Sequence, residues 1–167
     1  MTIENLNVLA TIEAIAELTR CCGSNRWVRE MINRRPFQSS DELFLQADRT
    51  WWSLSESDWK EAFTHHPKIG DIESLRKKFA STASWASGEQ EGATDASEET
   101  VKNLAEGNSL YEEKFGYIFI VCATGKSAEE MLIILHSRLP NSPEVEINIA
   151  AGEQAKITKL RLEKLLP

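Results

Sequence analysis

The sequence contains little of what disulfide-bonded, membrane-spanning or nucleic-acid-binding proteins are built from. Only three of its 167 residues are cysteine, and Cys21 and Cys22 are adjacent, which suits neither a disulfide framework nor a metal-ligand motif. No window approaches the ~20 apolar residues that a membrane-spanning helix needs. Lys and Arg number 19 against 26 Asp and Glu, a net charge of -7. This balance argues against nucleic acid as a partner.

Common catalytic motifs are also missing. The three histidines show no His-x-x-x-His spacing, and there is no Gly-x-Ser-x-Gly elbow, phosphate-cradling glycine loop or dinucleotide fingerprint. We therefore expect no metal site and no cofactor. The first residues lack the charged and apolar blocks of a signal peptide, and the C-terminus is not a peroxisomal tripeptide, so we expect a soluble cytoplasmic protein.

What the sequence does contain is a series of helix start and stop signals. Serines that precede apolar stripes, and prolines and glycines that follow them, predict an all-α, single-domain bundle of about eight helices over residues 1–167. The expected helices cover about 5–21, 24–35, 39–54, 55–63, 72–79, a longer one that starts at Thr94 or Ser97 and reaches 115, 127–139 and 142–165.

The apolar spacing also predicts which side chains face the core. In the first helix these are Leu6, Leu9, Ile12, Ala16 and Leu18. In the last helix they are Val145, Ile149, Ala150, Ile157, Leu160 and Leu165. Arg161 lies near this second stripe, where an arginine is either a snorkelling stem or a fork that binds a carboxylate.

One run, Phe115 to Ala123, has the aromatic and β-branched composition of a strand. No second segment offers a clear partner for it. We expect either a short, buried extended segment near 117–122 or absorption of the run into neighbouring helices. Backbone amides left unpaired near a pocket could bind a polar ligand.

The strongest candidate for chemistry is His66, which directly precedes Pro67. Proline cannot continue a helix and restricts the residue before it, so His66 is held at a helix exit. Imidazole exchanges a proton near neutral pH, which makes this a candidate general acid or base. The alternative, which the spacing alone favours, is a helix-ending loop that happens to contain histidine.

The segment 81–97 changes sharply in composition towards small residues. Trp85 and the pair Glu89 and Gln90 are costly to place in a linker without a purpose. A connection of this length is usually functional or disordered. A binding loop and a solvated surface excursion therefore both remain open.

Together these features resemble the 2-oxo-4-hydroxy-4-carboxy-5-ureidoimidazoline (OHCU) decarboxylase family. The resemblance covers nearly the whole chain and implies an all-helical, usually dimeric, cofactor-free enzyme of urate degradation that forms (S)-allantoin. It rests on the order and spacing of Trp27, Met31, Arg35-Pro36-Phe37, Trp51, Trp59 to Phe63, His65 to Gly70, Glu89-Gln90, Phe115-Gly116-Tyr117 and Glu153 to Leu162.

The resemblance also implies site residues. The family's catalytic histidine falls on His66, its acidic partner on Glu89 and its substrate-binding arginine on Arg161. Further residues implied to contact the small-molecule substrate are Pro67, Gln90, Tyr117, Ile118, Phe119 and Ile120. The family's serine beside the Glu-Gln pair does not transfer cleanly, so Ser84 and Ser87 are both candidates.

Two other functions remain as alternatives. A helical module could dock a partner protein through its acidic surface and aromatic patches, with His66 merely ending a helix. Metal-dependent amide hydrolysis of a related ureide is the other alternative, which the scarcity of clustered ligands disfavours. Turnover of the ureidoimidazoline would separate catalysis from docking.

Overall fold

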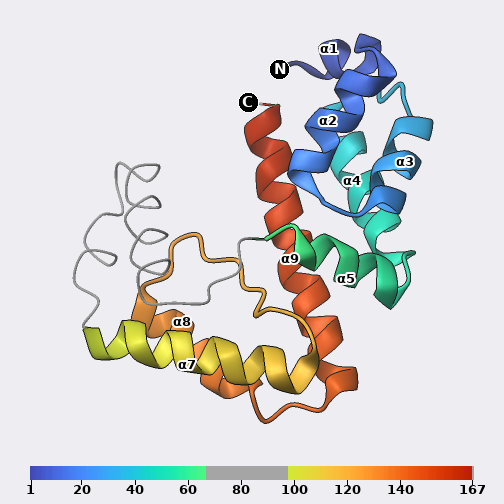
Figure 1. Cartoon of the computed structure of the whole chain (residues 1–167). Coiled ribbons are helices and arrows are strands. Elements are labelled where there is room, and N and C mark those ends of the chain that lie inside the picture. Colours follow the sequence, from blue (N-terminus) through green and yellow to red (C-terminus); the bar gives the residue numbers. More distant parts are fainter. Residues whose placement is uncertain (67–97, 167) are drawn as a thin grey trace. The chain divides into compact units, whose positions relative to one another are not determined.

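The computed structural model describes residues 1–66 and 98–166 (Figure 1). Within these ranges the chain is helical and contains no strand, which confirms the predicted all-α class. None of the described helices is long and apolar enough to cross a membrane. The helix expected over 72–79 and the segment 81–97 lie outside the described residues. The helices are α1 (Ile3–Val8), α2 (Thr11–Cys21), α3 (Asn25–Asn33), α4 (Ser40–Trp52), α5 (Glu56–Thr64), α7 (Glu98–Phe115), α8 (Ala128–Arg138) and α9 (Pro143–Leu165).

The chain divides into two compact units, and each is described by itself. The first contains residues 1–66 and 151–167, and the second contains residues 67–150. That residues 1–167 form one domain stays a prediction.

Three tryptophans hold the helices of the first unit together. The indole N–H of Trp27 donates to the carbonyl of Ala47 at 3.0 Å, which ties α3 to α4. That of Trp51 donates to Ala151 on α9 at 2.9 Å, and that of Trp59 on α5 donates back to Trp51 at 3.0 Å. Each ring is almost fully buried, so it contributes apolar area and also leaves no unsatisfied indole N–H.

Serine caps begin four of the described helices where the sequence predicts them. The side chains of Ser24, Ser39, Ser55 and Ser127 each accept a hydrogen bond from a backbone N–H in the first turn of α3, α4, α5 and α8. Such a cap satisfies one of the N–H groups that a helix start leaves unpaired. These helix starts are therefore confirmed.

The predicted first helix over 5–21 is wrong, because the chain forms α1 and α2 with a break at Leu9 and Ala10. Arg35 donates from Nη1 to the carbonyls of Leu6 and Leu9, both at 3.0 Å, and so satisfies the end of α1. The break also changes the buried face: Ile12 is 74% exposed. Ala16 is exposed as well, and the buried residues are Leu6, Ala14, Leu18 and Cys21.

The predicted buried face of α9 is also wrong. Val145 and Ile149 are exposed, and Ile157 and Leu160 are only half-buried. Three of the buried residues have polar side chains, namely Glu146, Gln154 and Thr158. The others are Ile147, Ala150, Ala151 and Leu162. Glu146 and Gln154 have polar partners elsewhere in the chain, described below, and these contacts explain why a different face of α9 is buried.

In the second unit α7 packs along α8, and a non-helical segment connects them (Figure 1). Residues 118–123 belong neither to a helix nor to a strand, so this part of the run is not absorbed into a helix. That it is extended stays a prediction. Gly116 has a φ of 78°, a left-handed conformation that glycine adopts without strain and that turns the chain out of α7.

Candidate functional site

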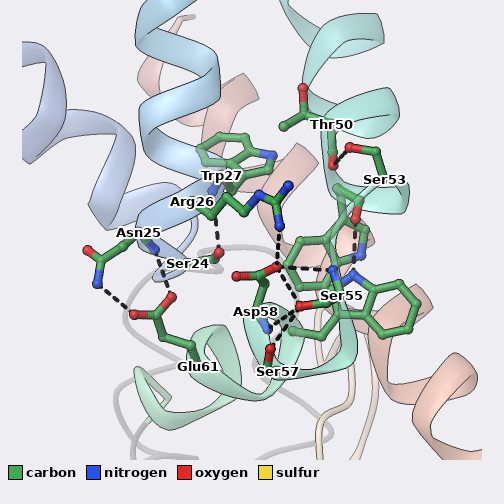
Figure 2. Close-up of polar contacts among 12 residues, drawn as sticks. Ser24, Asn25, Arg26, Trp27, Thr50, Ser53, Ser55, Ser57, Asp58 and Glu61 are labelled. Carbon is green, nitrogen blue, oxygen red and sulfur yellow. Dashed lines mark hydrogen bonds and ion pairs between the residues drawn. The ribbon is translucent and has the colours of Figure 1, made fainter.

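A polar network fixes α5, the helix that leads to His66, against the start of α3. Glu61 accepts from the backbone N–H of Asn25 at 2.9 Å and from its side-chain amide at 2.6 Å. Asp58 accepts from the hydroxyl of Ser55 at 2.7 Å and lies 3.6 Å from Arg26 (Figure 2). The hydrogen bond from Ser55 holds the pKa of the Asp58 carboxyl below its usual range. Both ends of α5 are therefore positioned by residues on the surface of the first unit.

The two adjacent histidines lie at the C-terminal end of α5 and have different surroundings. His65 is the C-cap residue and is exposed, and its ring packs over Gly23. A Cβ built on Gly23 would lie 2.3 Å from His65 Cγ, so only glycine fits at this point of the α2–α3 connection. His66 is half-buried, and its backbone N–H donates to the carbonyl of Phe63 at 3.2 Å.

The side chain of His66 reaches α9. Its Nε2 lies 2.5 Å from Oε1 of Gln154, a residue 88 positions later in the sequence. Nε2 of Gln154 in turn donates to the Thr158 hydroxyl at 3.1 Å. Gln154 is fully buried and Thr158 nearly so. The structure thus places the predicted acid/base residue at the end of a buried polar chain.

Arg161 lies two turns beyond Gln154 on α9, roughly 10 Å along the helix axis. Its Nη1 donates to the carbonyls of Arg20 and Cys21 at 3.3 and 3.5 Å. These carbonyls end α2, where a cation is favourable because the helix dipole places partial negative charge there. The half-buried guanidinium is therefore held by backbone, as a fork that binds an anionic edge must be.

Burial keeps the thiols of Cys21 and Cys22 neutral. All three are buried and free. Burial raises the pKa of Cys21 to about 11 and that of Cys22 to about 12, so both are protonated thiols at neutral pH.

In the second unit the segment Tyr117 to Ile120 is held by Arg138 on α8. Nη1 of Arg138 donates to the carbonyl of Ile120 at 2.7 Å, and its guanidinium carbon lies 4.7 Å from the ring centre of Phe119. The rings of Tyr117 and Phe119 pack edge-on against Tyr111, with centroids 5.9 and 5.2 Å away. These contacts hold the segment in place within the second unit.

The Arg138 charge is balanced inside the protein. Glu146, which is fully buried, accepts from Nε of Arg138 at 2.7 Å, from Nδ2 of Asn141 at 2.9 Å and from the Tyr111 hydroxyl. Burial is the main cause that raises the pKa of Tyr111 far above its usual range. Tyr111 therefore remains a neutral donor, and the carboxylate of Glu146 has partners for both of its oxygens.

A separate cavity of about 370 Å³ lies between α4 and α9 of the first unit. Its lining contains no histidine and none of the predicted site residues. Within the part of the chain that the structure describes, no group of three His, Cys, Asp or Glu side chains could hold a metal ion. The cavity is lined by Phe44, Ala47, Asp48, Trp51, Ala155, Lys156, Thr158, Lys159 and Leu162.

The structure brings His66 together with a residue to which the sequence analysis assigned no role. Gln154 stood there only as part of a matching block, because a lone glutamine on a helix carries no signal of the ring that it meets. Arg138 and Glu146 were missed for the same reason. Pro67, Ser84, Ser87, Glu89 and Gln90 lie outside the described residues.

A protein-family profile and several known proteins match this chain. A profile of the OHCU decarboxylase family matches residues 7–163. The Arabidopsis thaliana "Uric acid degradation bifunctional protein TTL" is 40% identical over 147 residues, which cover 87% of this chain and 45% of the plant protein. The chain thus spans less than half of that relative's length.

Two further matches extend over nearly the full length of the related protein. The "2-oxo-4-hydroxy-4-carboxy-5-ureidoimidazoline decarboxylase" of Haloferax volcanii is 26% identical over 166 residues, which cover 97% of this chain and 94% of that protein. A crystal structure of OHCU decarboxylase in the presence of (S)-allantoin superposes with a TM-score of 0.73 at 38% identity, covering 89% of this chain and 96% of that one. With the family profile spanning almost every described helix, this chain belongs to the OHCU decarboxylase family.

Proposed function

We propose that this chain decarboxylates 2-oxo-4-hydroxy-4-carboxy-5-ureidoimidazoline to (S)-allantoin in urate degradation. The observation that carries the proposal is the family match over residues 7–163. The relatives named for this activity, or for uric acid degradation, support the same substrate.

The substrate itself supplies the electron sink for this reaction. Its carboxylate is attached one carbon from a ring C=N, so the electron pair of the breaking C–C bond moves towards the imine as carbon dioxide leaves. The imine nitrogen takes up the charge and is protonated, the hydroxyl on the carbon that lost the carboxylate gives up its proton as its oxygen becomes a carbonyl, and a proton is added to one face of the former imine carbon. What the protein must supply is orientation, stabilisation of the developing charge and this one proton.

Within the proposal His66 exchanges the proton, Glu89 holds partner groups in place and Arg161 binds an anionic or carbonyl edge. The half-buried position of His66 and the backbone-held guanidinium of Arg161 support these roles. Substrate contacts are proposed for Pro67, Ser84, Ser87, Gln90 and the segment Tyr117 to Ile120. The firm anchoring of that segment by Arg138 supports its use as a binding element.

The proposal also includes a homodimer in the cytoplasm and no cofactor. These expectations come from the resemblance and from the composition. Size-exclusion chromatography with light scattering tests the dimer independently of activity.

Circular dichroism on freshly generated substrate tests the activity itself. The uncatalysed product is racemic, so only an enzyme-made excess of (S)-allantoin gives a signal. His66→Asn keeps about the size and one hydrogen bond of a neutral imidazole but cannot exchange a proton near pH 7. We expect it to lower kcat by about 100 to 10,000-fold, the usual contribution of a general acid or base.

His65→Asn is the matched control, since His65 is exposed at the same helix end. We expect a far smaller loss from it. Equal losses in the two variants, or unfolding of His66→Asn, would return the histidine pair to a structural role.

A further inference from the structure

A buried chain of polar side chains lies behind His66. It begins at His66 Nε2, passes through the amide of Gln154 to the hydroxyl of Thr158, and ends with a hydrogen bond between that hydroxyl and the Cys22 sulfur. Gln154 and Cys22 have no exposed surface, and Thr158 retains 4%. All four residues belong to the first unit.

Burying the glutamine amide is costly unless both of its ends are hydrogen-bonded. A leucine at this position of α9 would avoid that cost if only packing mattered. The two partners that the amide has are the imidazole and a hydroxyl on its own helix. The hydrogen bond to the histidine therefore explains why an amide is buried at this position.

The direction of the chain determines the tautomer of the ring. A carbonyl oxygen can only accept a hydrogen bond, so Oε1 of Gln154 requires a proton on His66 Nε2. In a neutral imidazole the other nitrogen, Nδ1, then carries the lone pair. The amide nitrogen of Gln154 points the other way, to Thr158.

We propose that Gln154 is a positioning residue that holds His66 as the Nε2–H tautomer, so that Nδ1 is the nitrogen that exchanges a proton with the substrate. The catalytic part of this inference rests on the proposed function. Gln154 acts on the reaction only through its hydrogen bond to the histidine. Because the Gln154 bond is made in both protonation states, the ring keeps its orientation through the proton transfer.

A reversed amide is the competing arrangement. The amide N–H of Gln154 would then donate to an unprotonated Nε2, and the ring would carry its proton on Nδ1. The hydrogen bond of Gln154 to Thr158 could form in either case, because a hydroxyl both donates and accepts. The two arrangements predict opposite tautomers of His66.

Nitrogen-15 NMR of labelled histidine reads the tautomer directly and does not depend on activity. The full chain is measured at a pH high enough for its imidazoles to be neutral. The spectrum of His66→Asn shows which signals belong to His66. We expect a protonated Nε2 and an unprotonated Nδ1 at His66. An unprotonated Nε2 overturns the proposal.

Two substitutions separate the role of Gln154 from packing. Gln154→Met keeps the length of the side chain but has no carbonyl, so we expect mixed tautomers at His66 and a kcat lowered by about tenfold, part of the acid/base contribution. Gln154→Glu keeps the acceptor and has no N–H to donate, so we expect the Nε2–H tautomer to persist. A switch of tautomer in Gln154→Glu would show that the amide is reversed.

Gln46→Met is the matched control, because Gln46 is half-buried on α4 and, among the described residues, its side chain bonds to Arg34 on the surface. It should leave both the His66 spectrum and kcat unchanged. An unchanged His66 spectrum in folded Gln154→Met overturns the positioning role. If wild-type protein forms no excess of (S)-allantoin, the proposed function fails, while the spectra still decide whether Gln154 sets the tautomer.

Discussion

At the scale of single residues, the surroundings of each charged side chain decide whether it contributes to stability or is available for binding. Arg138 and Glu146 form an ion pair at 2.5 Å whose side chains are 6% and 0% exposed. Lys60 and Glu56 form an i, i+4 pair at 3.8 Å whose side chains are 49% and 63% exposed. Removing one partner is therefore expected to cost more free energy of unfolding in the buried pair than in the exposed pair.

Arg138→Met should lower the free energy of unfolding by about 3 to 5 kcal/mol, because it leaves the Glu146 carboxylate buried without its counter-charge. Urea titration measures the effect. Glu56→Gln, the control, should cost no more than about 1 kcal/mol, as is usual for an exposed pair. A loss below 1 kcal/mol in Arg138→Met would mean that the carboxylate regains water or another partner.

Arg161 should behave differently, because its partners are carbonyls at a helix end and its side chain is half-buried. Lysine keeps the charge but loses the planar fork, so Arg161→Lys should reduce kcat/KM while leaving the melting temperature nearly unchanged. Arg34→Lys, on the surface of the same unit, is the control. An unchanged kcat/KM in Arg161→Lys would remove Arg161 from the site.

At the scale of helices, close approach between connections fixes where the histidine pair lies. Gly23 leaves no room for a Cβ beside the His65 ring, whereas a Cβ on Gly152, within α9, would meet nothing within 4 Å. Substitution by alanine is therefore expected to cause a clash at Gly23 and none at Gly152.

Gly23→Ala should displace the His65 ring and the end of α5, with a loss of stability and a lower kcat. Gly152→Ala should instead raise the free energy of unfolding by about 0.5 to 1 kcal/mol, since alanine favours a helix interior over glycine. Thermal unfolding and turnover by circular dichroism measure both effects. Full activity and stability in Gly23→Ala would show that His65 moves aside freely.

Asp58, at the start of α5, should also make the stability of the protein depend on pH in the acid range. The pKa of Asp58 is lowered in the folded state, so its contribution to stability is present above the carboxyl's unfolded pKa of about 3.9 and is lost as the pH falls through the lower folded value. Asp58→Asn should therefore destabilise the protein at pH 6 and make little difference near pH 2. Urea unfolding at the two pH values tests the sign, and an equal loss at both would exclude this ionisation as its cause.

At the scale of the whole molecule, the proposed chemistry places the electron sink in the substrate rather than in a bound ion. Activity should therefore survive exhaustive dialysis against EDTA, measured as the rate of (S)-allantoin formation. Loss of turnover that is restored by zinc would favour metal-dependent chemistry and contradict the cofactor-free proposal.

The sequence by itself determined the features whose causes are local. Serine caps and their partners three residues on lie within one helical turn, so α3, α4, α5 and α8 begin where the pattern predicts. The placement of His66 at a helix exit follows from Pro67 in the same way. The OHCU decarboxylase pattern could be read because the residues that carry it keep their order and spacing along the chain.

Only the tertiary structure decided the features that depend on partners far along the chain. The break between α1 and α2 is satisfied by Arg35, and the polar face of α9 is buried because Glu146 meets Arg138 and Gln154 meets His66. Apolar periodicity gives no sign of such pairs, since a buried polar side chain looks like a surface residue until its partner is known. The identity of the residue that orients His66 was for this reason hidden in the sequence, 88 positions away.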